Sequence, residues 1–219
     1  MTEVAISPMG MGALLLDAAG AVFSEPVQAR IHAVAARLRA RRDIQEVVPG
    51  MNNLLVCFDP VGTDPAASER LLRELWSRAE VQNTPTGKTV EIPVTYGGAA
   101  ATDLQLWAAH CGLTVAEAIR RHAEGRYHVA AVGAMPGFPY LSGLDPSLAI
   151  GRRAVPRAVV AEGSVIIGGM QAGIMPTTAP SGWHIIGHTP VRLFDPEAEN
   201  PSLLAPGDRL RFVIAAILP

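Results

Sequence analysis

The sequence predicts an α+β fold in two parts, a small sheet covered by helices and then a β-barrel or sandwich. Up to about residue 80, strand-like and helix-like patterns follow the order ββαββα, which is typical of an antiparallel sheet with helices packed on it. A polar segment with Pro and Gly, Gln82–Lys88, is the best linker candidate. From Tyr127 onward, short strand-like runs alternate with connections rich in Gly and Pro, which favours a barrel or sandwich. We therefore predict one domain in residues 1–84 and a second in 85–219.

In the first domain, each predicted element has a local reason. Pro26 can open a helix because the first turn does not need its N–H. Behind it, apolar residues recur with the spacing of one helix face: Ile31, Val34, Ala35 and Leu38. A second helix is predicted from about Pro65 to Ala79. The predicted strands are Val4–Ile6, Ala13–Leu16, Ile44–Val48 and Asn53–Phe58.

The second domain is predicted to begin with one strand and two short helices. Thr114 and Glu117 fit a capping box, in which each side chain satisfies a backbone N–H at the start of a helix. The apolar face of this helix carries His122. The predicted helices are Leu104–His110 and Val115–Ala123. The predicted strands are Thr89–Thr95, Tyr127–Val132, Ser164–Gly168, Trp183–Gly187, Val191–Phe194 and Arg209–Ile214.

Composition limits the classes of function. The 219 residues are 49% hydrophobic and 17% charged, so the chain can bury a sizeable core. The formal net charge of −2 argues against a nucleic-acid binder, which usually carries a basic stripe. Cys57 and Cys111 lie in separate apolar segments, which favours reduced thiols over a metal site. The N-terminal apolar run is broken by Pro8 and Asp17 and lacks a basic start, so we expect a cytoplasmic protein.

Three segments of the second domain are poorly explained by packing alone. In the first, two prolines flank Gly-Phe and predict a rigid loop that presents aromatic side chains. In the second, dense glycines can expose backbone N–H groups to a ligand, and Gln171 can bond an amide or a carboxylate. In the third, strand alternation puts Trp183 and Ile185 on one face and His184 and Ile186 on the other. The segments are Met135–Leu141, Gly163–Pro176 and Pro180–Pro190.

Each of these segments also has a purely structural explanation, as a strand corner, a glycine-rich hairpin or a strand with a structural histidine. Histidine can transfer protons near neutral pH, but a lone histidine is more often structural. The spacing of His184 and His188 is a poor match to a metal pair on a strand, and we predict no metal site. From the residues alone, the chain is a two-part protein with a candidate site rich in Gly and Pro.

Taken together, the motifs resemble one family along nearly the whole chain. These motifs are Pro49-Gly50-Met51-Asn52-Asn53, Tyr96-Gly97-Gly98, Pro136-Gly137-Phe138-Pro139-Tyr140-Leu141, Gly163-Ser164-Val165, Gly168-Gly169 with Gln171 and Gly173, Gly182-Trp183 with Ile186-Gly187, Phe194-Asp195-Pro196 and Pro206-Gly207-Asp208. The chain resembles the B-type 5-oxoprolinase subunits, a group also called the KipI or allophanate hydrolase subunit 1 family.

The resemblance implies a ferredoxin-like N-terminal domain and a cyclophilin-like β-barrel. It implies the smaller subunit of an enzyme that opens 5-oxoproline to glutamate, with ATP as co-substrate, together with Mg²⁺, and with no tightly bound cofactor. The implied partners are the C-type 5-oxoprolinase subunit, of the KipA or allophanate hydrolase subunit 2 family, and the A-type subunit. We expect no activity without them. Relatives that inhibit a histidine kinase, or that belong to the carboxyltransferase region of urea carboxylase, leave a regulator and a carboxyltransferase component as alternatives.

Under this resemblance we assign candidate roles within the barrel domain. His184 and His122 are the candidate proton-transfer groups, and Gln171 is the candidate contact to the reacting amide. We expect Gln171, His184 and the loop Pro136–Tyr140 to surround one cleft. Substrate or ATP binding is assigned to Pro136, Gly137, Phe138, Tyr140, Arg157, Gly168, Gly169 and Gly173.

The chain departs from the family pattern inside this region. A Thr-Gly-x-Tyr-Pro run is expected where Ala172-Gly173-Ile174-Met175-Pro176 stands, so a hydroxyl and a phenol are missing. Ser181 replaces a glycine before Gly182-Trp183, and Val132-Gly133-Ala134 replaces Leu-Gly-Phe. These changes concern the identity of the substrate more than the fold.

Overall fold

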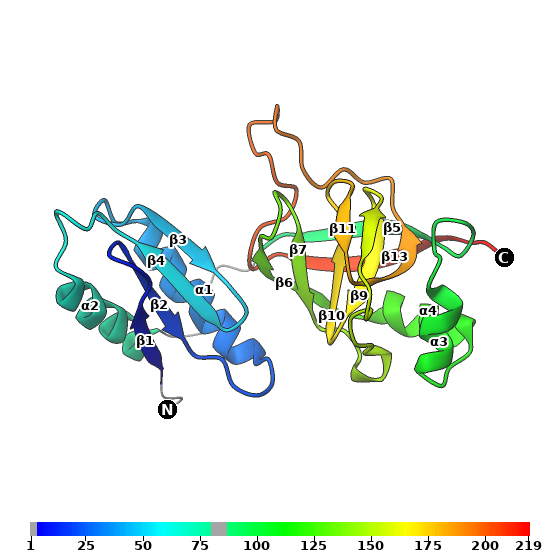
Figure 1. Cartoon of the computed structure of the whole chain (residues 1–219), viewed down its shortest axis with the longest axis horizontal. Helices are drawn as coiled ribbons and strands as arrows, with labels where there is room; N and C mark the ends of the chain where they lie inside the picture. The colour runs from blue at the N-terminus through cyan, green and yellow to red at the C-terminus, as the bar shows by residue number, and fades with distance from the viewer. Residues whose placement is uncertain (1–3, 80–86) are drawn as a thin grey trace. The chain divides into compact units, whose positions relative to one another are not determined.

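The structure of the chain, a computed structural model, describes residues 4–79 and 87–219. The chain divides into two compact units, Met1–Thr86 and Gly87–Pro219 (Figure 1). Most of the predicted linker, Gln82–Lys88, lies outside the described residues. The linker and the domain boundary between residues 84 and 85 therefore remain predictions.

The first unit is a four-stranded antiparallel sheet with two helices (Figure 1). The strands pair in the order β1-β2-β4-β3. Every predicted element of this unit is present, with ends that differ by at most a few residues. The elements are β1 Ala5–Pro8, β2 Ala13–Asp17, α1 Glu25–Arg39, β3 Glu46–Pro49, β4 Asn53–Cys57 and α2 Pro65–Arg78.

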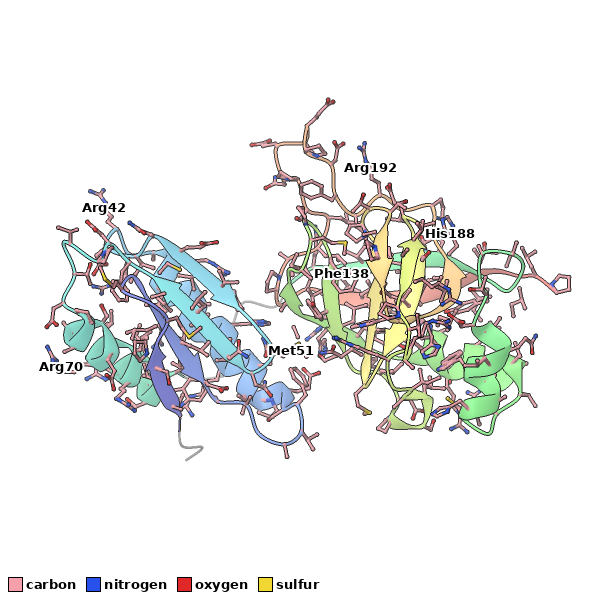
Figure 2. All side chains as sticks on the ribbon, viewed as in Figure 1. Arg42, Met51, Arg70, Phe138, His188 and Arg192 are labelled. Carbon is pink, nitrogen blue, oxygen red and sulfur yellow. The ribbon has the colours of Figure 1, made fainter. Side chains whose placement is uncertain are left out.

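Both helices of the first unit begin as the sequence predicts. Ser24 caps α1 by accepting a hydrogen bond from the N–H of Val27, and Asp64 caps α2 in the same way from Ala66. A proline occupies the first turn of each helix. Charged side chains such as Arg42 and Arg70 point away from this unit (Figure 2). Its own core contains buried apolar side chains from both helices and from the sheet, including Leu16, Ile31, Leu38, Leu54 and Trp76.

The motif Pro49–Asn53 is a structural clamp between a strand turn and α1. Asn52 is 2% exposed and has a φ of 58°, in the left-handed region. Its side-chain amide accepts a hydrogen bond from the N–H of Ser24 at 2.7 Å and donates one to the Ser24 carbonyl at 2.9 Å. Its backbone N–H donates to the side chain of Gln28 at 2.7 Å. This family motif therefore holds the fold of the first unit together.

The second unit contains a closed seven-stranded barrel in the order β10-β7-β6-β13-β5-β12-β9. Only β5 and β13 pair in parallel; the other pairs are antiparallel. A separate two-stranded ribbon joins β8 and β11. The elements are β5 Thr89–Tyr96, α3 Leu104–His110, α4 Val115–Glu124, β6 Tyr127–Val132, β7 Pro139–Ser142, the 3-10 helix η2 Pro146–Leu148, β8 Arg157–Val160, β9 Ser164–Gly168, β10 Gln171–Ile174, β11 Ala179–Ser181, β12 His184–His188 and β13 Arg209–Ile217.

The barrel interior and the helices α3 and α4 share one core. The two helices lie together next to the barrel in Figure 1, and α4 packs against β13. Trp107 of α3 is fully buried and donates its indole N–H to the Leu148 carbonyl at 2.9 Å. Side chains from both helices and from strands β5, β6, β9, β10, β12 and β13 complete this core. No helix in the described ranges is long and apolar enough to cross a membrane.

One predicted strand of the second unit is wrong, and four strands were not predicted. Val191–Phe194 forms no strand; Phe194 makes only an isolated bridge to Ser202. Its backbone groups find other partners, because Val191 donates to the Thr189 hydroxyl and Leu193 accepts from Leu203. The strands β7, β8, β10 and β11 were missed because each has only three or four residues and contains or adjoins Pro or Gly.

Candidate functional site

A small apolar cluster lies on the outside of the barrel, beneath the ribbon β8–β11. We call it the outer cluster: Phe138, Val160, Ile166, Met175, Trp183 and Ile185. The predicted alternation around β12 is confirmed, because Trp183 and Ile185 belong to the outer cluster and Ile186 belongs to the barrel core. The same alternation in β9 sends Ile166 outward and Ile167 inward.

The loop before β7 brings Phe138 into this cluster. It connects the antiparallel strands β6 and β7, in which Val132 pairs with Pro139. The loop is closed by hydrogen bonds from Gly133 N–H to the Phe138 carbonyl at 3.0 Å and from Phe138 N–H to the Met135 carbonyl at 3.1 Å. Gly137 has a φ of 78°, and a Cβ there would lie 2.8 Å from Phe194 Cβ. This position therefore requires glycine.

Three aromatic rings meet edge to face in and beside the outer cluster. The ring centroids of Phe138 and Tyr140 are 5.0 Å apart, those of Phe138 and Trp183 are 5.7 Å apart, and those of Tyr140 and Trp183 are 6.2 Å apart. Their planes cross at 69–81°. Edge-to-face pairs of this kind are favourable beyond the area they bury, so the three rings hold one another in place.

The glycines of β9 and β10 make room for these rings. A Cβ on Gly168 would lie 2.5 Å from the Trp183 ring, and a Cβ on Gly173 would lie 2.9 Å from Phe138. Gly169 has a φ of 65° and stands first in the two-residue turn between Gly168 and Gln171, where glycine is preferred. The assignment of these glycines to ligand binding stays a prediction, and packing or turn geometry explains each of them.

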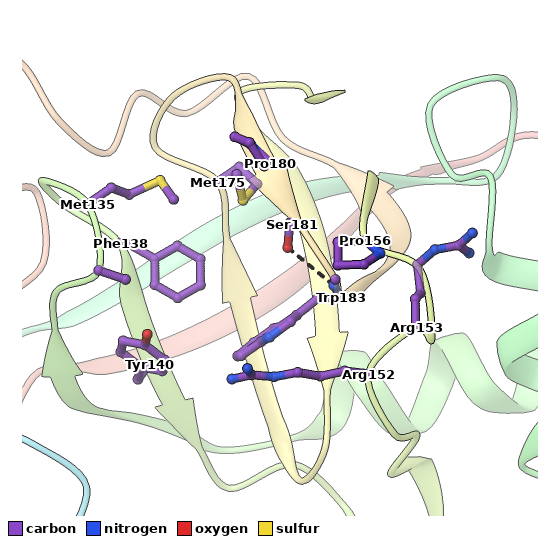
Figure 3. Close-up of a pocket in the computed structure, with 12 residues that line it drawn as sticks. Met135, Phe138, Tyr140, Arg152, Arg153, Pro156, Met175, Pro180, Ser181 and Trp183 are labelled. Atoms are coloured by element: carbon purple, nitrogen blue, oxygen red, sulfur yellow. Dashed lines mark hydrogen bonds between the residues drawn. The ribbon is translucent and has the colours of Figure 1, made fainter. Parts of the chain in front are cut away.

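A cleft of about 270 Å³ opens beside the three rings (Figure 3). Figure 3 shows Met135, Phe138 and Tyr140 on one side, Trp183 with Arg152 on another, and Met175 and Pro180 nearby. The Arg152 guanidinium lies 5.9 Å from the centre of the Trp183 ring. The lining residues are Ala134, Met135, Phe138, Tyr140, Arg152, Arg153, Pro156, Met175, Pro180, Ser181, Gly182 and Trp183.

A buried carboxylate anchors the arginine-bearing segment that lines the cleft. Asp103, 3% exposed, stands before α3 and accepts two hydrogen bonds from the Arg157 guanidinium, at 2.7 and 2.8 Å. It also accepts one from Arg153 at 3.2 Å and one from the Ile185 N–H at 2.8 Å. Burial raises the pKa of Asp103, but the hydrogen bonds from Arg157 and Ile185 outweigh it and hold the pKa below its usual value. The carboxylate thus stays charged and ties α3, β12 and the segment 151–157 together.

The predicted site residues fall into three groups. Phe138 and Tyr140 line the cleft, and Pro136 and Gly137 shape the loop that carries Phe138. Arg157 is bound to Asp103 and is not among the residues that line the cleft. The Gly168–Gln171 turn and Gly173 do not line it either. Gln171 is half-buried at the start of β10.

The expectation that His184 and Gln171 share one cleft with the loop is wrong. His184 pairs with the inward-facing Ile167, on the side of β12 opposite Trp183. Its Nε2 lies 3.0 Å from the Gly151 carbonyl, so Nε2 donates the hydrogen, and its buried Nδ1 has no partner among the described residues. Strand alternation is the reason: the residue next to a ring in the outer cluster must face the barrel.

His122 is fully buried in the core between α4 and the barrel. Its Nδ1 lies 2.7 Å from the Tyr96 hydroxyl, and its ring stacks on Phe212 at 4.5 Å. Burial lowers the pKa of His122 from 6.5 to about 3, so the ring is neutral at physiological pH. No substrate in the outer cleft can reach this ring, and we do not include it in the proposed site.

Sequence reasoning missed Arg152, Arg153 and Asp103. The available signal was Gly151-Arg152-Arg153, two adjacent arginines in a connection close to Pro156. Asp103 gave only a weak signal, as a polar residue immediately before a helix. Of the family departures, Met175 lies in the outer cluster and lines the cleft with Ser181, whereas Ala172 lies in the barrel core.

The family model of the carboxyltransferase domain, subdomains C and D, matches residues 4–204. The chain belongs to this family. Within it, the B-type 5-oxoprolinase subunit of Escherichia coli O157:H7 is 46% identical over 187 residues, which cover 85% of this chain and 85% of that protein.

Solved structures give the same picture of the fold. A crystal structure of TTHA0988 superposes with a TM-score of 0.80 at 35% identity and covers 93% of this chain. The chain spans 40% of the length of that protein. The urea amidolyase of K. lactis superposes with a TM-score of 0.80 at 18% identity over 97% of this chain and 15% of that one. The latter likeness concerns the fold only.

Proposed function

We propose that the chain is the smaller subunit of an ATP-dependent 5-oxoprolinase. The observation that carries the proposal is the 46% identity to a B-type 5-oxoprolinase subunit over 85% of both chains. Further relatives of the same name, from Haemophilus influenzae and Bacillus subtilis, are 42% and 35% identical. The proposed reaction converts 5-oxo-L-proline, ATP and water to L-glutamate, ADP and phosphate. The cytoplasm is the proposed location.

The chemistry explains why ATP is needed. The lactam of 5-oxoproline is a stable amide, and transfer of the γ-phosphoryl group to its oxygen, with loss of ADP, makes the carbon electrophilic. Water then adds to that carbon, and the C–N bond breaks with a proton going to nitrogen, which leaves γ-glutamyl phosphate. A second water hydrolyses this acyl phosphate to glutamate and phosphate. Such a reaction requires donors for the developing negative charge and a group that accepts the proton of water.

The cleft supplies only part of this machinery. Its lining offers guanidinium groups, a serine hydroxyl and a tyrosine hydroxyl, and no lining residue is His, Asp, Glu or Cys. A magnesium–nucleotide does not fit this donor set, because Mg²⁺ prefers carboxylate oxygens. Within residues 4–79 and 87–219, no three His, Cys, Asp or Glu side chains gather as a metal site. We therefore assign the general base and the nucleotide site to the partner subunits of the C and A types, in a hetero-oligomer.

The proposal also includes the finer fold names, ferredoxin-like and cyclophilin-like. Supporting the first name, ββαββα with the sheet order β1-β2-β4-β3 is what a βαββαβ ferredoxin-like unit gives when its last strand moves to the front of the chain. The closed barrel supports the second name.

The test is reconstitution of the enzyme from its subunits. The chain is co-expressed with the two neighbouring subunits, and glutamate release from 5-oxo-L-proline is measured with and without ATP. We expect ATP-dependent turnover from the complete complex and none from this chain alone or from the other subunits alone. A complex that turns over equally well without this chain contradicts the proposal, and so does robust turnover by this chain alone.

A further inference from the structure

The cleft beside the outer cluster carries an excess of positive charge. Arg152 and Arg153 line it, and none of the lining residues is acidic. The carboxylate that binds Arg153 is that of Asp103, which also accepts hydrogen bonds from Arg157 and the Ile185 N–H. Arg153 and Arg157 thus share one carboxylate, Arg152 adds a further positive charge, and the cleft favours a ligand with negative charge.

Arg152 is the arginine that is available to a ligand. Within the described residues it has no ion pair, and its guanidinium lies over the face of Trp183 at 5.9 Å. A guanidinium placed on an aromatic face keeps its N–H edge open to a second partner. Arg153 also lines the cleft, and its buried Nε has no hydrogen-bond partner among the described residues.

The rest of the lining suits a flat, partly apolar ligand. Phe138 and Trp183 are both 5% exposed, and Tyr140 is half-buried against them. The volume of about 270 Å³ accommodates a small ring and not a nucleotide, since pockets for drug-sized ligands begin at about 300 Å³. Edges and faces of the three rings meet at the cleft, which gives a planar molecule a surface to pack against.

We propose that this cleft binds a small planar cyclic carboxylic acid, with Arg152 as the partner of the carboxylate and the aromatic rings as the wall for the ring. Resting on the proposed function, this acid is 5-oxo-L-proline. Asp103 acts as a positioning residue, because it fixes Arg153 and Arg157 and thereby the segment from which Arg152 projects. Arg153 is held there by a second contact, from its N–H to the Gly182 carbonyl at 2.8 Å.

The experiment measures binding by calorimetry on the full-length chain, with three probes: 5-oxo-L-proline, the neutral lactam 2-pyrrolidinone, and inorganic phosphate. The variant is Arg152→Gln, which keeps a polar side chain and removes the charge. The matched control is Arg192→Gln, an exposed arginine that is absent from the cleft lining and pairs with Asp195 at 3.5 Å. We expect the acid to bind at least tenfold more tightly than the neutral lactam, and Arg152→Gln alone to weaken acid binding at least tenfold.

The same variants are assayed in the assembled complex. There, Arg152→Gln should raise the KM for 5-oxo-L-proline at least tenfold with a smaller change in kcat, and Arg192→Gln should change neither. The inference is overturned if the acid binds neither the chain nor the complex, if Arg152→Gln leaves both Kd and KM unchanged, or if phosphate displaces the acid and binds more tightly. An active complex with an unchanged KM overturns this inference and leaves the proposed function standing. An inactive complex whose isolated chain still binds the acid through Arg152 does the reverse.

Discussion

His122 sits among the aromatic rings of the core between α4 and the barrel, touching Tyr96, Trp107, Tyr127 and Phe212. Its Nε2 is buried without a hydrogen-bond partner among the described residues. Protonation would place a positive charge in an apolar core, and burial lowers the pKa of His122 from 6.5 to about 3 for this reason. His122, which was predicted from the sequence to be a proton-transfer group, therefore affects the free energy of unfolding.

This burial predicts a pH dependence of the free energy of unfolding. Between pH 6.5 and about 3, the unfolded chain binds a proton at His122 and the folded chain does not. The free energy of unfolding therefore falls as the pH drops below 6.5, by up to about 1.4 kcal/mol per pH unit, and this contribution is constant above 6.5. Urea unfolding at pH 7.5, 6.0 and 5.0 measures the slope.

The variant His122→Phe removes the titrating group and keeps a ring that can pack against Phe212. Its slope between pH 6 and 5 should be shallower than that of the wild type, whatever its absolute stability. His110→Gln, at an exposed position on α3, is the matched control and should keep the wild-type slope. Equal slopes for all three proteins would show that His122 is solvated or protonated in the folded state.

Single residues also show where sequence reasoning fails. Arg157 was predicted to bind substrate or ATP, but the structure pairs it with Asp103, which lies 54 residues earlier in the chain. Nothing local to Arg157 reveals that partner. Arg152 remains available because the fold places it on Trp183 and away from Asp103, which is a tertiary fact. An arginine could be singled out from the sequence, whereas the partners of each arginine in the fold could not.

At the scale of elements, the hairpin β9–β10 makes the aromatic wall possible. Its outward positions alternate between Ile166, Gly168, Gln171 and Gly173, and the two glycines leave a flat strip of backbone beside Trp183. A glycine inside a strand usually weakens packing, but here it permits the close approach of an indole ring. Two of the glycines noted in the sequence, Gly168 and Gly173, thus make room for rings of the protein itself.

Gly168→Ala should therefore disturb Trp183 directly. The new Cβ would lie 2.5 Å from the ring, so the indole must shift, and overpacking of this kind costs about 1–3 kcal/mol of unfolding free energy. The near-UV circular dichroism of the tryptophans should change as well. Urea unfolding and the near-UV spectrum measure both effects.

Gly133→Ala is the control for Gly168→Ala, because no atom lies within 4 Å of a Cβ at position 133. Its unfolding free energy should stay within about 0.5 kcal/mol of the wild type. If Gly168→Ala is equally neutral and leaves the spectrum intact, the ring does not pack on the hairpin as described.

In the second unit, elements of five residues or more were predictable and shorter strands were not. The helix Leu104–His110 and the strands Tyr127–Val132 and Ser164–Gly168 match the structure residue for residue, because each carries an apolar run or an apolar face. The strands β7 and β11 have no such period: β7 starts at a proline, and β11 is three residues long. They exist because neighbouring strands offer hydrogen-bond partners. Since β7 and the ribbon β8–β11 were not predicted, the sequence named Phe138 and Tyr140 as binding residues but could not show what surrounds them.

At the scale of the whole molecule, the buried apolar residues form separate clusters, and each cluster consists of residues from one unit. One core lies entirely within residues 4–79, and the barrel core and the outer cluster lie entirely within 87–219. The sequence predicted this division, because the pattern of strands and helices gives way to short strand-like runs with Gly and Pro. Each half also carries enough apolar residues for its own core. The sequence could not show which face of the barrel would carry a cleft, since that depends on strand order.

This separation predicts that residues 87–219 fold when expressed without the first unit. Every strand of the barrel, both packed helices and all lining residues of the cleft are contained in that stretch. Its size is typical of an independently folding domain, and its barrel is closed, so no long sheet edge is left for aggregation.

The excised chain should show near-UV signals from Trp107 and Trp183 and a single cooperative urea transition. Leu141→Ala, at a fully buried barrel position, should lower its unfolding free energy by about 2–5 kcal/mol and so identify the transition with the barrel core. An excised chain without near-UV signal, or with a gradual transition that Leu141→Ala does not move, would show that the barrel core depends on residues before 87.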